Sequence, residues 1–226
     1  MTQETLKLFR LLVPGILIVL LFLPFLQMDF QGEPIWKYIP AAAPLPLLPD
    51  WIKTSLVIAV TGALYYVIDV RGYFLAQSMS AIHDNIKNDL LQPFERCAPI
   101  AAATPSLRKG RILLDIFYSF IDNDETLKAR ATNVRFNGLI LSSAADLAAV
   151  SSIGFVAYFV TFLALWSRGF LFLTVVCGVT YLITTTVLMP KVTKRHIALG
   201  DEQLAFIRSN YFEDLKTKLM VSTRGN

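Results

Sequence analysis

Cysteine, histidine and charged side chains are all scarce in this chain of 226 residues. The two cysteines, Cys97 and Cys177, are too few and too far apart in sequence for a disulfide framework. Charged residues make up 17% of the chain, whereas soluble domains contain about 25%. The mean hydropathy is correspondingly high, at +0.53. This balance excludes an ordinary water-soluble domain and indicates a membrane protein.

The sequence also lacks the motifs of the common catalytic and metal sites. It contains no P-loop, no GxSxG nucleophile elbow, no HExxH pair and no zinc-type spacing of cysteine and histidine. Its only histidines, His83 and His196, are isolated in sequence and are interpreted as surface residues. We therefore predict that the protein is not an enzyme and that it binds no cofactor or metal.

Two apolar runs without a single charge, residues 147–165 and 169–189, dominate the C-terminal half. Each is close to the ~20 residues that a helix needs to cross the hydrocarbon of a bilayer. The residues between them, Trp166-Ser167-Arg168-Gly169, suit a tight turn with the indole at the membrane interface. Residues 141–190 are therefore predicted to form a transmembrane helical hairpin.

Two further spans are predicted in residues 1–78, at 11–27 and 54–76, joined by a proline-rich external loop. Because Lys7 and Arg10 precede the first apolar run, a secretory signal peptide is the alternative interpretation of that run. The residues that follow, Gln27-Met28-Asp29-Phe30, offer no small-x-small cleavage site. This favours an uncleaved first span.

The remaining segments, 79–140 and 191–226, carry amphipathic helical patterns. In the first, we expect a helix to begin at Thr104-Pro105 and to stop near Asp122-Asn123-Asp124. In the second, Gly200-Asp201 is interpreted as a break before a last helix. The predicted fold class is all-α: an integral membrane bundle of four transmembrane helices with cytoplasmic helical extensions.

Lysine and arginine alternate along the chain in a way that sets the expected topology. Two precede the first span, two lie in the first loop, Arg71 lies at the inner end of the second span, eight lie between the second and third spans, one is in the hairpin turn and seven are in the tail. Because cytoplasmic segments carry the excess of basic residues, we expect both termini in the cytoplasm of a bacterial cell, with the protein in its inner membrane.

A polar stripe marks the second span. Its members fall at spacings of 7, 4, 4 and 3 residues, which would place them on one face of a straight helix: Thr54, Thr61, Tyr65, Asp69 and Gly72. A carboxylate at membrane depth usually faces a water-filled path or a partner. The stripe therefore predicts a pore lining, and the alternative is that Asp69 lies at the headgroups and pairs with a basic residue.

Small residues in the third span repeat every four positions, at Ala144, Ala148 and Ser152. Small residues allow helix backbones to approach closely in lipid, where no hydrophobic force drives association. We interpret this stripe as a packing face, within one chain or between copies, and predict a homo-oligomer that uses it.

Two basic groups are candidates for binding an anionic ligand, such as a nucleotide or an oligonucleotide. They are Arg108, Lys109 and Arg111 in the central segment, and Lys191, Lys194 and Arg195 after the fourth span. The alternative is that they anchor the chain at lipid headgroups.

In organisation, the chain resembles the small multi-span membrane effectors, of ion-channel type, of bacterial antiviral defence systems. The resemblance covers the layout of the whole chain, rests on no diagnostic motif and transfers no residue roles. It implies a homo-oligomeric channel or pore-forming effector, gated through its cytoplasmic helices by a partner protein or an anionic, nucleotide-like signal. The second hypothesis is a non-conducting scaffold or sensor subunit that recruits a cytoplasmic partner, and a membrane-embedded enzyme or small transporter is disfavoured.

Overall fold

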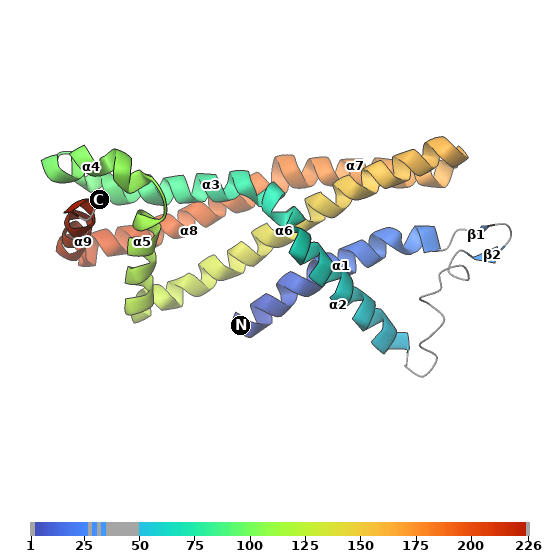
Figure 1. Ribbon diagram of the computed structural model, residues 1–226, viewed down its shortest axis with the longest axis horizontal. Helices are drawn as coiled ribbons and strands as arrows, with labels where there is room; N and C mark the ends of the chain where they lie inside the picture. The colour runs from blue at the N-terminus through green and yellow to red at the C-terminus, as the bar shows by residue number, and fades with distance from the viewer. Residues whose placement is uncertain (1–2, 27–28, 31–32, 35–49, 225–226) are drawn as a thin grey trace. The chain divides into compact units, whose positions relative to one another are not determined.

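The computed structural model describes residues 3–26, 29–30, 33–34 and 50–224 (Figure 1). Most of the expected proline-rich loop lies outside these residues. The described residues are helical except for short connections and one two-stranded antiparallel pair, β1 (Asp29–Phe30) and β2 (Glu33–Pro34), in which Asp29 is opposite Pro34. The all-α class is therefore confirmed. The chain divides into two compact units, one made of residues 1–75 and 142–189 and the other of residues 76–141 and 190–226.

The first unit holds the apolar helices. It contains α1 (Gln3–Leu26), α2 (Asp50–Ile68), the start of α3 (Val70–Leu91), the second part of α6 (Glu125–Leu165), α7 (Arg168–Ile183) and the π-helical turn η4 (Thr184–Leu188). Helices α1 and α2 pack closely at Gly15, where a side chain would collide with the Ile58 carbonyl group. The expected turn of the hairpin is confirmed, because α6 ends at Leu165 and α7 begins at Arg168.

Two helices are long and apolar enough to cross a membrane, Glu125–Leu165 and Arg168–Asn210, which runs through α7, η4 and α8 (Met189–Asn210). A third span results if α2 and α3, which are bent by 55° at their junction, are counted together. The apolar part of α1, Leu8–Leu21, is shorter than a span. The described residues thus support two or three spans and do not clearly give the four that were expected.

The second unit is a helical cluster with an aliphatic and aromatic core. It contains the rest of α3, the 3₁₀ turn η3 (Gln92–Phe94), α4 (Ala98–Arg108), α5 (Ile112–Asn123), the first part of α6, most of α8, and α9 (Phe212–Arg224). Its core consists of fully buried aliphatic side chains such as Leu90, Leu113 and Leu215, and Phe94 stacks on Phe212 with ring centroids 5.0 Å apart. The segments 79–140 and 191–226 therefore fold together.

Three expected helix boundaries are corrected, and one is confirmed. Helix α4 begins at Ala98 because Pro99 suits its first turn, so the expected start at Thr104-Pro105 lies inside the helix. Gly200-Asp201 lies inside α8, because the buried face of that helix continues through Leu204 and Ile207. The helix that contains the 169–189 run does not end at Pro190, since it continues through the π turn Thr184–Leu188 into α8. The stop near Asp124 is confirmed, and Asp124 caps α6 by accepting the Leu127 amide at 2.7 Å.

Candidate functional site

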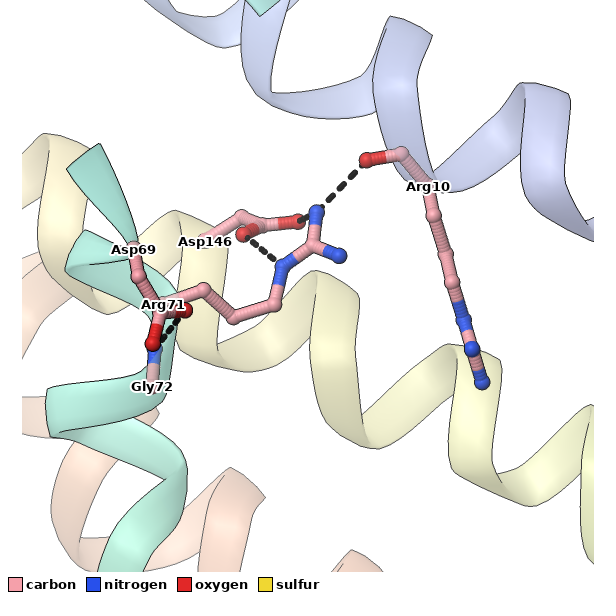
Figure 2. A network of polar contacts seen from close by, with 5 residues as sticks. All are labelled: Arg10, Asp69, Arg71, Gly72 and Asp146. Carbon is pink, nitrogen blue, oxygen red and sulfur yellow. Dashed lines mark hydrogen bonds and ion pairs between the residues drawn. The ribbon is translucent and has the colours of Figure 1, made fainter. Parts of the chain in front are cut away.

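The second apolar helix of the chain is broken at Asp69. This residue has a φ of +52°, a conformation that aspartate adopts more readily than most residues. Its carboxylate Oδ1 accepts the backbone N–H of Gly72 at 3.2 Å, so Asp69 is the N-cap of α3 (Figure 2). A side chain at Gly72 would overlap the Asp69 carboxylate, which explains why glycine stands there. The break is therefore built by residues 69–72 themselves.

An ion pair lies immediately after the break. Arg71 Nε donates to Asp146 Oδ1 at 2.7 Å, and Arg71 Nη2 donates to Asp146 Oδ2 at 2.8 Å, so the pair is bidentate. Nη2 also donates to the backbone carbonyl of Arg10 at 2.6 Å, and Figure 2 shows the guanidinium between these two partners. One arginine thus joins α3 to α6 and to α1.

The pair is withdrawn from solvent. The Asp146 side chain is 1% exposed and the Arg71 side chain 11% exposed, and buried Tyr65 lies beside the Asp146 carboxyl group. Burying either charge alone would be costly, and the two hydrogen bonds of the bidentate contact are what make burial tolerable. Chemically, the site can hold a helix junction in place and release it when the pair separates.

The expected pore stripe does not lie on one face of one helix, because the break separates Tyr65 in α2 from Gly72 in α3. Tyr65 is buried within the chain, Asp69 serves as a cap, and the Thr61 hydroxyl donates to the backbone carbonyl of Val57. The side chain of Thr54 lies outside the described part of the structure. Asp69 is exposed and its carboxylate accepts the Gly72 amide, and the alternative that it lies at the headgroups stays a prediction.

Sequence reasoning missed Arg71 and Asp146. Asp146 was assigned no functional role from the sequence, yet it is the only charged residue between Arg135 and Arg168. A single carboxylate in such a stretch needs a partner, and that isolation was the available signal. Arg71 was recognised only as the end of a span.

The small-residue stripe is used inside the chain. Ala144 and Ala148 are 3% and 0% exposed and form a cluster with Met189, against which Phe74 and Tyr181 pack. The Ser152 hydroxyl donates to the backbone carbonyl of Ala149 at 2.9 Å. The close packing predicted from these residues therefore takes place between helices of one chain, which leaves Ala144 and Ala148 unavailable to a second copy.

All six basic candidates lie in the second unit, and their side chains are exposed: Arg108, Lys109, Arg111, Lys191, Lys194 and Arg195. Arg111 Nε lies 3.9 Å from Asp115 Oδ1, which is a surface contact. Among the described residues, no group of three or more His, Cys, Asp or Glu side chains is arranged to hold a metal.

Comparisons with protein families, with curated proteins and with solved structures gave no match for this chain.

Proposed function

We propose that this protein is a multi-pass membrane protein that assembles with copies of itself into an ion-conducting channel. The observation that carries the proposal is the buried Arg71–Asp146 pair at the break of an apolar helix. Discontinuous helices and buried charges in membrane proteins are found mainly along ion and substrate pathways. Because the sequence contains no common catalytic motif, we favour a role of this site in ion conduction over a role in catalysis.

In this proposal the ion pair controls gating by holding α3 against α6 and α1. Arg71 connects α3 to α6 and α1 while the pair is formed, and the Asp69 cap supports the bend between α2 and α3. Separation of the pair would free α3 to straighten or rotate at Asp69. A bidentate contact is either made or broken, so it provides the two discrete arrangements that a gate requires.

The assembly and orientation follow from charge and from the number of spans. Two or three helices cannot enclose a pore, so several copies are needed. Fifteen of the 21 lysine and arginine residues lie in residues 76–141 and 190–226, which favours a cytoplasmic position for the second unit and an inner-membrane location. There it would be accessible to a cytoplasmic protein or to an anionic ligand that gates the channel.

Ion flux from liposomes that contain the purified protein tests this proposal. We expect wild type to conduct and Asp146→Asn to raise the flux, because the amide cannot hold the guanidinium as strongly. Asp89→Asn is the matched control, since Asp89 also pairs with an arginine, Arg208, at 3.2 Å but in the second unit. Absence of flux from wild type, or equal flux from wild type and Asp146→Asn, would reject the channel.

The second candidate function is a non-conducting scaffold or sensor subunit. It is favoured by apolar side chains that α9 exposes, namely Val221 and Phe212, which are 65% and 39% exposed. Such residues suit a partner surface. A folded protein that gives no flux but retains a cytoplasmic partner through α9, and loses it on Val221→Asp, would support this function in place of the channel.

A further inference from the structure

The second unit contains a cavity of about 130 Å³ between α3, α5, α6 and α8. Most of its wall is apolar and comes from the first three of these helices: Ile82, Ile86, Phe117, Ile121, Ala131 and Val134. The exposed side chains Tyr118, Asp122 and Arg135 line the part that opens to solvent. The cavity lies wholly within the second unit and is separate from the Arg71–Asp146 pair.

One face of α8 closes the cavity, with His196, Gly200 and Gln203 at spacings of four and three residues. Gly200 is buried, yet a Cβ atom added to it would meet nothing within 4 Å. The open space in front of α8 is thus a direct result of glycine at this position. His83 of α3 also lines the cavity. The two histidines, which the sequence left isolated on the surface, therefore contribute to the same site.

This wall contains a buried hydrogen-bond donor that has no acceptor among the described residues. Gln203 is 1% exposed, and its Nε2 atom has no partner among the described residues, which is costly for a buried amide. Asn137 Nδ2 donates to the Val192 carbonyl at 3.1 Å and lies 3.2 Å from His196 Nδ1. Because Nδ1 accepts this hydrogen bond, the ring proton of neutral His196 is on Nε2.

The volume of the cavity and the charges around it restrict the class of ligand further. A cavity of ~150 Å³ is large enough for benzene, so about 130 Å³ accepts one ring and excludes a whole nucleotide. Arg135 and Asp122 line the opening, and Lys87 and Arg111 act electrostatically on His83, opposed by Asp84. This environment disfavours a cation.

We propose that the cavity binds a small single-ring molecule that carries a carbonyl or carboxylate oxygen. Gln203 and His196 donate to that oxygen, and the isoleucine and phenylalanine side chains cover the ring. This site goes beyond the proposed channel and does not depend on it, because binding can be measured whether or not the protein conducts.

Ligand-observed NMR on the full chain in lipid nanodiscs, with empty nanodiscs as the blank, tests the ligand class. The probes are benzamide, benzoate and benzylamine. We expect benzamide and benzoate to bind, and benzylamine to bind at least ~10-fold more weakly, because it lacks an acceptor oxygen and is cationic. Absence of benzamide binding to wild type, or equal binding of all three probes, would overturn the proposal.

Substitutions on α8 test the location. Gly200→Leu should fill the cavity and weaken benzamide binding by at least ~10-fold, whereas Gly200→Ala adds only a methyl group and should leave the affinity within about 2-fold. Gln203→Met keeps the length of the side chain without the donor and should weaken benzamide ~3- to 10-fold, the value of one neutral hydrogen bond.

Circular dichroism and thermal unfolding show whether each variant is folded. If Gly200→Leu does not fold, the benzamide affinity of Gln203→Met and the ranking of the three probes test the proposed site. Benzamide affinity that is unchanged in folded Gly200→Leu, or in Gln203→Met, would place the ligand elsewhere and contradict the assignment.

Discussion

In the first unit many exposed side chains are large and apolar and many buried residues are small or polar, whereas in the second unit large aliphatic side chains form the core and most charged ones are exposed. Val156 and Phe172 of the first unit are 60% and 67% exposed, while Ala148 and Asp146 are almost fully buried. In the second unit Leu90 and Leu215 are fully buried and most charged residues face outward.

On the membrane placement proposed above, this difference reflects two solvents. In water, burial of leucine and isoleucine drives folding. In lipid that drive is absent, and helices associate through close packing of small residues and through polar contacts. The two units of one chain therefore follow different rules of stability, and substitutions of the same kind should have different effects in each.

The largest expected difference concerns two Arg–Asp pairs. Asp146→Ala in the first unit should lower the free energy of unfolding by about 3–5 kcal/mol, because Arg71 would remain buried without its partner. Asp89→Ala in the second unit should cost about 1 kcal/mol or less, since the Asp89 and Arg208 side chains are 32% and 27% exposed. Denaturant unfolding in detergent measures both. Equal losses would mean that the two environments do not differ.

A smaller difference is expected for Ala→Leu on two helices. Ala148→Leu should destabilise the first unit by about 1–3 kcal/mol, because its methyl group is already packed among Met189 and Phe74. Ala198→Leu on the exposed surface of α8 should change stability by no more than about 0.5 kcal/mol. Thermal unfolding of the two variants gives the comparison. A neutral Ala148→Leu would show that this interior is not close-packed.

The smallest expected effect is a loss of stability of the second unit at acidic pH. Hydrogen bonds from the Tyr211 hydroxyl and the Leu127 amide lower the pKa of Asp124. Because the folded state favours the carboxylate, its stabilising contribution is complete above the unfolded pKa of about 4 and is lost as the pH falls below it. Wild type should lose more thermal stability than Asp124→Asn on acidification through this range. Parallel curves for the two proteins would show that Asp124 is not responsible.

The hairpin was predictable because 147–165 and 169–189 carry no charge, and few structures other than a pair of apolar helices suit such runs. The turn was predictable for the same reason, since only three residues, 166–168, separate them. These are local features, and one segment of sequence determines each.

The Arg71–Asp146 pair and the cavity were not predictable, because both depend on residues far apart in sequence. Arg71 and Asp146 are 75 residues apart, and His83 and His196 are still further apart. When helical periodicity is analysed one segment at a time, Asp69 is assigned to a stripe on a straight helix and each histidine is interpreted as isolated. Pro190 and Gly200 were misjudged because local breaker signals were outweighed by the buried face of α8.

The central claim, that the outer surfaces of the two units face different solvents, is tested by placing one charge on each. Val156 lies in the middle of the 147–165 run and is 60% exposed, and Val221 on α9 is 65% exposed. Val156→Lys should prevent stable membrane insertion, since lysine at the centre of a spanning helix costs about 2.5–3.5 kcal/mol. Val221→Lys should insert and unfold as wild type does. The measurements are the fraction of each protein found in purified membranes and its melting temperature. Wild-type values of both quantities for Val156→Lys would contradict the account.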